Sequence, residues 1–253
     1  MNKPVVIKSI AEFKSFKKDL KGSFGLVPTM GALHAGHASL LKKSALDNHH
    51  TVLSIFVNPT QFNDPTDLDK YPRTFDQDFS LAETCNVSAI FYPDYKEIYP
   101  DDYRFFVSEK SFSKILCGSA RPGHFDGVLT VIMKLFNIVG PNKAYFGEKD
   151  FQQLTLIEDM VKAFFMPIEI YRVATFREAS GLAMSSRNRR LSTDGLNQAS
   201  LIYKTITTAL NADEAKNILT ENGFQVDYLQ DIHQRRFVAA YLEGIRLIDN
   251  VTI

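Results

Sequence analysis

Short apolar runs alternate with amphipathic segments through the first two thirds of the chain. Residues 51–57 form a nearly continuous apolar run of strand length, which is typical of a parallel strand covered on both faces. Residues 10–20 instead carry Ile10, Phe13 and Leu20 at helical spacing, with lysines between them. These two patterns predict strands at 5–7, 24–27, 51–57, 89–92, 143–146 and 168–173, and helices at 10–20, 36–46, 75–85, 128–139 and 150–164.

This alternation predicts an α/β fold with a doubly wound, Rossmann-like parallel sheet. Asp150 and Gln153 have the spacing of a capping box at the start of the last of these helices. A further short strand is expected at 105–107, and a glycine-containing loop at 117–127.

After about residue 175 the pattern changes. A loop rich in arginine and serine, 177–190, precedes a helix that Ser192 can cap and that runs through Leu210. A second helix is expected at 213–221, followed by weakly alternating antiparallel strands at 224–232 and 237–242. We therefore expect a Rossmann-like domain at 1–175 and a smaller C-terminal α+β domain at 176–253.

Charge and cysteine content narrow the class of protein. The chain of 253 residues has 29 Lys and Arg against 29 Asp and Glu, and no long basic tract, which argues against nucleic acid as a partner. Cys85 and Cys117 have neither metal-like nor redox-like spacing, so a reducing compartment is expected. The N-terminus lacks the apolar segment of a signal peptide, and no run is long enough to span a membrane. A soluble cytoplasmic protein is expected.

Polar loops follow several of the predicted strands. They lie at 28–37, 58–61, 147–150 and 183–187, and the carboxyl ends of parallel strands are where such sheets bind ligands. The first loop delivers His34 and His37 at a helix start, where unpaired N–H groups favour a phosphate. Taken one at a time, Gln61, Lys149 and the serines near 185 could equally be ordinary loop or surface residues.

Several motifs carry a resemblance to a known family. Residues 28–37 contain His-x-Gly-His, similar to the first signature of the nucleotidylyltransferase and class I synthetase superfamily, and Met-Ser-Ser-Arg-Asn at 184–188 resembles a variant of its second signature. Four more segments narrow the match. They are Phe-Val-Asn-Pro-Thr-Gln-Phe (56–62), Tyr-Pro-Arg-Thr (71–74), Arg-Pro-Gly-His-Phe-Asp-Gly-Val (121–128) and Phe-Gly-Glu-Lys-Asp-Phe-Gln-Gln (146–153). From about residue 20 to 190, and faintly at 246–250, the chain resembles the pantothenate synthetases, or pantoate–β-alanine ligases.

The resemblance implies a reaction and a set of site residues. Members of this family use ATP and Mg²⁺ to form a pantoyl-adenylate, which β-alanine then converts to pantothenate and AMP. By analogy His37 is a proton donor, His34 and Lys149 assist catalysis, Gln61 and Gln153 bind pantoate, and Gln61 also contacts β-alanine. Magnesium is expected to bind mainly through the ATP phosphates, and a homodimer is implied. The positions that match ATP contacts are Met30, Gly31, Ala32, Leu33, His34, Ala35, Gly36, His37, Gly147, Glu148, Lys149, Asp150, Phe176, Met184, Ser185, Ser186 and Arg187.

Three positions depart from the family pattern. Ala35 replaces Glu or Gln at an expected solvent-facing position, Thr60 replaces a larger apolar residue near the pantoate site, and Ser180 replaces Asp. The chain is also shorter than is usual, which suggests a shortened second domain. We expect that domain to act as a lid bringing residues 184–187 to the nucleotide.

Two other functions are alternatives to ligation. A nucleotidylyltransferase that moves AMP or CMP onto a phosphate acceptor would need cations where Gln61 and Gln153 stand. A nucleotide-binding module without turnover would use the same loops and catalyse nothing. A tRNA-charging enzyme is disfavoured by the length and neutral charge of the chain.

Overall fold

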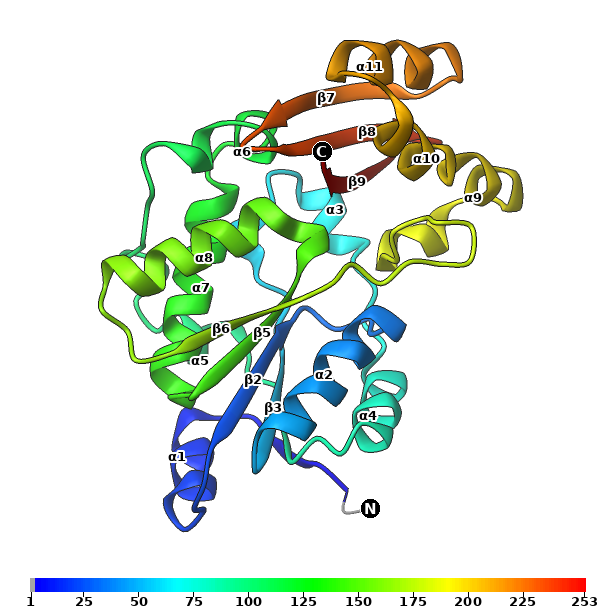
Figure 1. Ribbon diagram of the computed structural model, residues 1–253. Helices are drawn as coiled ribbons and strands as arrows, with labels where there is room; N and C mark the ends of the chain where they lie inside the picture. The colour runs from blue at the N-terminus through cyan, green and yellow to red at the C-terminus, as the bar shows by residue number, and fades with distance from the viewer. Residues whose placement is uncertain (1–2) are drawn as a thin grey trace.

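The computed structural model describes residues 3–253 and contains two separate sheets (Figure 1). The larger sheet has six strands in the order β1-β4-β3-β2-β5-β6, and all of its pairings are parallel. This confirms the predicted doubly wound parallel sheet. Its strands are β1 (Val5–Ile7), β2 (Phe24–Thr29), β3 (His50–Ile55), β4 (Ala89–Phe91), β5 (Lys143–Gly147) and β6 (Glu169–Val173).

Helices cover both faces of this sheet (Figure 1). Alternate strand residues point to opposite faces, so Leu26 belongs to one apolar cluster and Val27 to another. The first cluster includes residues of α1 (Ile10–Lys18), α7 (His124–Val139) and α8 (Phe151–Ala163). The second includes residues of α2 (Ala35–Asp47) and α4 (Phe75–Thr84). Burial on both faces explains the continuous apolar runs in the sequence.

Strand order reverses at β2. The chain moves from β2 through β3 to β4 on one side, and then returns to place β5 and β6 on the other side of β2. The carboxyl ends of β2 and β5 therefore flank a topological switch point, where sheets of this kind open a crevice for ligands. The loops at 28–37 and 147–150 begin there.

The smaller sheet is antiparallel and lies above the carboxyl edge of the large one (Figure 1). It consists of β7 (Gln225–Ile232), β8 (Arg235–Leu242) and β9 (Ile245–Thr252), with α9 (Thr193–Ala199), α10 (Leu201–Thr208) and α11 (Ala212–Glu221) beside it. Its apolar cluster includes Leu182, Ile206 and Val238 and is separate from the other two. β9 was not predicted, because Asp249 and Asn250 are polar residues buried within it.

Several local predictions were wrong. No strand forms at 105–107, where the Val107 N–H instead donates to the Thr130 hydroxyl. The expected loop at 117–127 contains α6 (Cys117–Ala120) and the first turn of α7. The single helix expected from Ser192 to Leu210 is divided into α9 and α10 at Ser200.

Short elements complete the chain. They are α3 (Pro65–Asp69), α5 (Tyr95–Ile98), and the 3₁₀ turns η1 (Pro59–Gln61), η2 (Phe112–Lys114), η3 (Glu148–Asp150) and η4 (Ser186–Arg190). Three of these turns, η1, η3 and η4, fall in polar loops that the sequence singled out. Within residues 3–253, none of the helices has the length and apolarity to cross a membrane.

Candidate active site

A cavity of about 250 Å³ opens at the switch point. It is lined by residues of the large sheet, of α2 and α7, of the loops that follow the strands, and of the segment 174–187. It brings together loops that are more than a hundred residues apart in the sequence. The segment from Met30 to His37 lies on one side, and the segment from Met184 to Arg187 on another. The predicted site residues that line it are Met30, His34, Gly36, His37, Gln61, Gly147, Lys149, Asp150, Gln153, Phe176, Met184, Ser185, Ser186 and Arg187.

Five predicted residues lie outside this lining: Gly31, Ala32, Leu33, Ala35 and Glu148. The backbone N–H groups of Ala32 and Leu33 donate to the carboxylate of Asp78, at 3.0 and 2.7 Å. Those two amides are therefore occupied by the protein itself. Asp78, which is buried in α4, fixes the glycine-containing loop and was missed from sequence.

His34 and His37 cap the helix that they begin. His34 is the N-cap of α2, and its Nδ1 accepts from the Gly36 N–H at 3.2 Å. His37 Nδ1 accepts in turn from the His34 N–H at 3.3 Å. A neutral imidazole that accepts at Nδ1 carries its proton at Nε2. Each ring thus offers an Nε2–H donor, and the two ring centroids are 4.1 Å apart.

Both rings are neutral at pH 7. Burial, and then the positive charge of Lys149, lower the pKa of His34 to about 4. Burial, and then His34, lower the pKa of His37 to about 3. The same direction is expected wherever a cationic imidazolium would lose its hydration. The site therefore presents two neutral hydrogen-bond donors rather than two cations.

The Gln61 side chain is oriented by Asn58. Asn58 is buried, and its Nδ2 donates to Gln61 Oε1 and to the Gly127 carbonyl, both at 3.1 Å. The Gly127 carbonyl can only accept, so it fixes which end of the Asn58 amide carries the NH₂ group, and the Tyr99 hydroxyl donates to Asn58 Oδ1 at 2.9 Å. The Gln61 NH₂ group is left on the cavity side, 3.2 Å from the sulfur of Met30. Because Asn58 uses the Gln61 oxygen, the side chain of Gln61 can offer a ligand its NH₂ group.

Gly127 lets α7 approach η1 closely. A Cβ on Gly127 would lie 2.6 Å from the Thr60 carbonyl oxygen and 2.8 Å from the Gln61 nitrogen. The Thr60 side chain does not line the cavity, because its hydroxyl donates to Asn58 Oδ1 at 3.0 Å. Thr60, which stands in place of a larger apolar residue, therefore hydrogen-bonds to Asn58, and Asn58 in turn holds Gln61.

Lys149 and Asp150 enter the cavity from η3. The expected capping box is wrong, since the Asp150 side chain makes no capping hydrogen bond. Lys149 Nζ lies 3.8 Å from the Asp150 carboxylate. Asn250 Nδ2 donates to the carbonyls of Glu148 and Lys149 at 3.0 and 2.9 Å, so β9 holds this turn in place. The faint sequence match at 246–250 was the signal for this contact.

Strand β9 also provides the partner of Arg177, in the loop that contains Ser180. Asp249 is buried and forms a two-pronged ion pair with Arg177, at 2.6 and 2.9 Å. Ser180 is exposed in the turn beside Arg177, and its hydroxyl accepts from the Leu182 N–H at 3.4 Å. The departure from Asp at this position leaves the buried carboxylate of Asp249 as the partner of Arg177.

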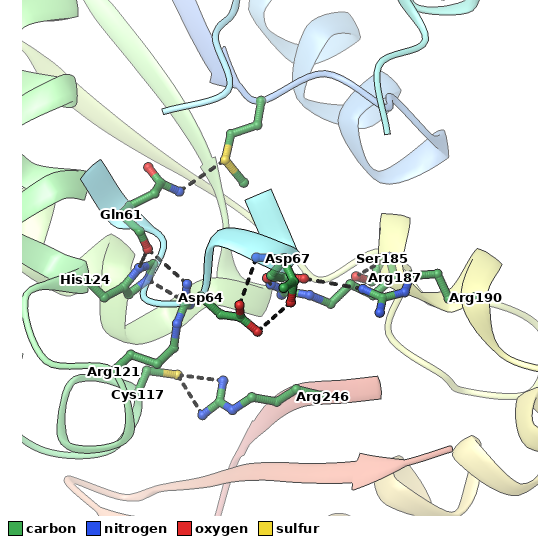
Figure 2. Close-up of polar contacts among 12 residues, drawn as sticks. Gln61, Asp64, Asp67, Cys117, Arg121, His124, Ser185, Arg187, Arg190 and Arg246 are labelled. Carbon is green, nitrogen blue, oxygen red and sulfur yellow. Dashed lines mark hydrogen bonds and ion pairs between the residues drawn. The ribbon is translucent and has the colours of Figure 1, made fainter. Parts of the chain in front are cut away.

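The segment that ends in η4 lies close to α3 (Figure 2). The Ser185 hydroxyl caps η4 by accepting from the Arg187 N–H at 3.2 Å. Arg187 and Arg190 both reach the carboxylate of Asp67 in α3, at 3.5 and 3.4 Å. Arg189 donates to the Leu33 carbonyl at 3.2 Å. Arg189, which directly follows the second motif, therefore contacts the first motif.

Tyr71 is a lining residue that sequence reasoning did not assign to the site. Burial raises the pKa of its hydroxyl, and Ser186 hydrogen-bonds to it. Its place in the Tyr-Pro-Arg-Thr segment was the available signal. Of the residues that line the cavity, Asp150 alone carries a carboxylate. Within residues 3–253, no three His, Cys, Asp or Glu side chains are gathered as a metal ion would require.

Comparison with known proteins gives a consistent result. The family model described as pantoate-beta-alanine ligase matches residues 5–252. The chain is 58% identical over 248 residues to the pantothenate synthetase of Bdellovibrio bacteriovorus, covering 98% of this chain and 99% of that relative. The second domain is thus no shorter here than in that relative. A pantothenate synthetase of Coxiella burnetii is 45% identical, with 97% of this chain and 96% of the relative covered.

Solved structures agree. The pantoate-beta-alanine ligase of Francisella tularensis, complexed with beta-gamma ATP and beta-alanine, superposes with a TM-score of 0.94 at 41% identity, covering 98% of this chain and 97% of that one. The pantothenate synthetase of Thermus thermophilus gives a TM-score of 0.89 at 34% identity, with 98% and 99% covered.

Proposed function

The chain belongs to the pantoate-beta-alanine ligase family, and from this premise we propose how its residues share the work of ligation. The enzyme joins pantoate to β-alanine at the expense of ATP, through a pantoyl-adenylate, and releases AMP and diphosphate. The observation that carries our assignment of roles is the cavity at the switch point, which both motifs of the sequence line. The nucleotidylyltransferase alternative is not favoured.

In the first step the pantoate carboxylate attacks the α-phosphate of ATP, and negative charge builds on the phosphate oxygens. We assign His34 and His37 to these oxygens, as Nε2–H donors at the start of α2. Lys149 supplies the mobile cation beside them. His37 thus acts in our proposal as a hydrogen-bond donor, since its pKa of about 3 leaves no imidazolium to release a proton at pH 7.

Pantoate is assigned to Gln61 and Gln153, which both line the cavity. The NH₂ group of Gln61 faces the cavity and can donate to a pantoate oxygen, because Asn58 holds its carbonyl end. The nucleotide is assigned to Gly36, Gly147, Asp150, Phe176 and the segment from Met184 to Arg187. No nucleophile of the protein is required, because the activated intermediate is an acyl-adenylate.

We propose that residues 1–175 bind the nucleotide and pantoate and that residues 176–253 act as a lid. The contacts of Arg187 and Arg190 with Asp67 hold this part of the second domain against α3, and Arg187 also lines the cavity, which supports this role. A chain lacking residues 176–253 should form no adenylate, and retained adenylate formation would refute the lid.

The side chains that line this cavity could offer Mg²⁺ one carboxylate, that of Asp150. With Asp150 as the single lining carboxylate, the ion would be held by the ATP phosphates and by Asp150, as Mg²⁺ commonly is in nucleotide sites. When bound, it would neutralise charge on the departing diphosphate. The residues of the chain then serve to position pantoate and the α-phosphate.

A homodimer and a cytoplasmic location are part of the proposal. The exposed Phe105 (67%) and Phe106 (57%) in the aromatic segment near α5 give an apolar surface for the second copy. The cytoplasm supplies the ATP that the reaction consumes.

The experiment is product analysis with pantoate, β-alanine and ATP. We expect pantothenate and AMP in equal amounts, with none formed when β-alanine is left out. Transfer of AMP to a phosphate acceptor, or release of AMP without amide, would contradict the assignment.

A further inference from the structure

The loop between β2 and α2 contains two consecutive residues in the left-handed region. They are Gly31 and Ala32, with φ angles of +81° and +50°. Glycine adopts this conformation freely, whereas the Cβ of alanine crowds the following carbonyl oxygen. Ala32 is also fully buried, so its N–H group has no access to water. Contacts with the rest of the chain therefore have to hold Ala32 in this conformation.

Asp78 supplies these contacts from α4, which lies beside α2 (Figure 1). Its Oδ2 accepts from the Ala32 N–H at 3.0 Å, and its Oδ1 accepts from the Leu33 N–H at 2.7 Å. A carboxylate can receive two neighbouring N–H groups at once, whereas a side-chain amide offers only one oxygen. The two hydrogen bonds fix the peptide groups on either side of Ala32, and these groups define its backbone angles.

Within residues 3–253, no lysine, arginine or histidine forms an ion pair with Asp78. The other donor to its carboxylate is the Thr74 hydroxyl, at 3.2 Å from Oδ1. Thr74 is the last residue of the Tyr-Pro-Arg-Thr segment, so this segment orients the carboxylate. Asp78 also lies in the first turn of α4, where a carboxylate is favoured. A buried carboxylate with only neutral donors is costly, and its two bonds to the loop give it a role there.

The loop has open space beside Met30 and Gly31. Met30 lines the active cavity and also a cavity of about 610 Å³, which Gly31 and Asp78 line as well. A Cβ on Gly31 would come within 3.0 Å of Asp78 Oδ2, so a glycine allows the carboxylate to reach the loop. Packing against neighbours is limited at this point, and the hydrogen bonds to Asp78 therefore set the course of the backbone.

The peptide groups that Asp78 holds lie between two residues of the active cavity. Met30 precedes them, and His34 follows them as the N-cap of α2. Leu33 is bonded at both ends, because its N–H donates to Asp78 and its carbonyl accepts from Arg189 at 3.2 Å. A turn of the backbone at Ala32 would therefore move Met30 relative to His34 and displace the carbonyl that the second domain contacts.

We propose that Asp78 is a positioning residue for adenylate formation, an inference that rests on the proposed function. Its carboxylate holds Ala32 in the left-handed conformation, and the loop then presents Met30 and His34 to the cavity and the Leu33 carbonyl to Arg189. Asp78 is not among the residues that line the active cavity, so it acts through the loop and not on a substrate. Its effect belongs to the step in which the histidine donors meet the phosphates.

Asp78→Asn tests this role at nearly constant side-chain volume. One of the two N–H groups then faces an NH₂ group instead of an oxygen, so the loop loses one of its two anchors. In single-turnover reactions with pantoate and saturating ATP, adenylate formation per folded molecule should slow by about 10- to 100-fold. Asp76→Asn is the matched control, because it removes an exposed carboxylate from the same turn of α4, and its rate should stay within about twofold.

A second substitution separates positioning from a general loss of stability. Glycine adopts a φ near +50° without strain, so adding Ala32→Gly to Asp78→Asn lowers the need for the carboxylate. The double variant should form the adenylate at least about fivefold faster, per folded molecule, than Asp78→Asn alone. A purely structural role would change the folded fraction, measured by urea denaturation, and leave this rate the same in both variants, which would contradict the proposal.

Hydrogen exchange in the unaltered enzyme does not depend on the folding of any variant. Before ATP is added, the N–H groups of Ala32 and Leu33 should exchange with D₂O at least about 100 times more slowly than exposed amides of the same chain. Rapid exchange of both, or an unchanged rate of adenylate formation in folded Asp78→Asn, would overturn the positioning role. Absence of adenylate in the unaltered enzyme would instead refute the proposed function.

Discussion

At the scale of single residues, Gly127 and Gly147 differ in the space that surrounds them. A Cβ on Gly147 would meet nothing within 4 Å and would project beside the active cavity, whereas a Cβ on Gly127 would collide with the η1 backbone. We infer that the first glycine leaves space for a ligand, whereas the second permits contact between two parts of the chain. Sequence alone shows both simply as loop or helix glycines.

The Gly147→Ala variant should therefore fold normally and bind ATP poorly. We expect its free energy of unfolding to change by less than about 0.5 kcal/mol and its KM for ATP to rise about tenfold or more. Gly127→Ala should instead lose about 1–3 kcal/mol of stability because it overpacks the α7–η1 contact. Urea denaturation and steady-state kinetics on the pair check this. A Gly147→Ala variant with unaltered KM would contradict the assignment.

His37 should contribute to adenylate formation as well as to the cap of α2. Removing one donor to the developing charge in His37→Ala should lower the rate of adenylate formation by about 10²–10³. Single-turnover kinetics with pantoate and ATP measure that rate, and the circular dichroism spectrum confirms that the variant folds. Full activity in His37→Ala would end the proposed role.

The buried His124 makes stability depend on pH. Its pKa is lowered from 6.5 to about 3 in the folded chain, so below pH 6.5 the unfolded chain binds a proton that the folded chain does not. Stability therefore falls as the pH drops from 7 to 5, by at most about 2 kcal/mol for this residue. In denaturant titrations at the two pH values, His124→Gln should lose less stability than the unaltered enzyme. Equal losses would show that His124 is protonated in the folded state.

At the scale of elements, the parallel strands were predictable and their exact ends were not. Burial on both faces makes central strands such as β3 and β4 nearly continuous apolar runs, and this signal is strong in a single sequence. Element β9 was missed because its buried Asp249 and Asn250 hydrogen-bond to segments far away in the chain. No local pattern encodes such a contact.

The same limit applies to the candidate site. The loops at strand ends pointed to Gln61 and Lys149, and the motifs named most of the cavity lining. Asn58, Tyr71 and Asp78 were not assigned to the site, and two of them, Asn58 and Asp78, act by holding another residue in place. Their importance follows from packing and hydrogen bonding across the fold, which appear only in three dimensions.

Asn250 tests the link between β9 and η3. Asn250→Ala removes two hydrogen bonds from its side chain to the carbonyls of Glu148 and Lys149. We expect a loss of about 1–3 kcal/mol of stability and a raised KM for ATP, because Lys149 is then less well positioned. Thr252→Ala, at an exposed residue of the same strand, is the control and should change stability by less than about 0.5 kcal/mol. Equal kinetics in the two variants would contradict the link.

At the scale of the whole molecule, the site is formed where two parts of the chain meet. The segments that follow β2 and β5 contribute His34, His37 and Lys149, and the smaller part contributes the segment from Met184 to Arg187. Arg189 on Leu33 and Arg187 on Asp67 join the two across the cavity. Activity in this account requires both parts in one chain, positioned around one nucleotide.

The most direct test of this account is isolation of the intermediate. The enzyme is incubated with pantoate, ATP and Mg²⁺ but no β-alanine, quenched, and analysed by mass spectrometry. We predict one pantoyl-adenylate per site, which disappears when β-alanine is added and is replaced by equal amounts of pantothenate and AMP. Formation of pantothenate with no adenylate detected at any time, or an adenylate that β-alanine does not consume, would contradict the account.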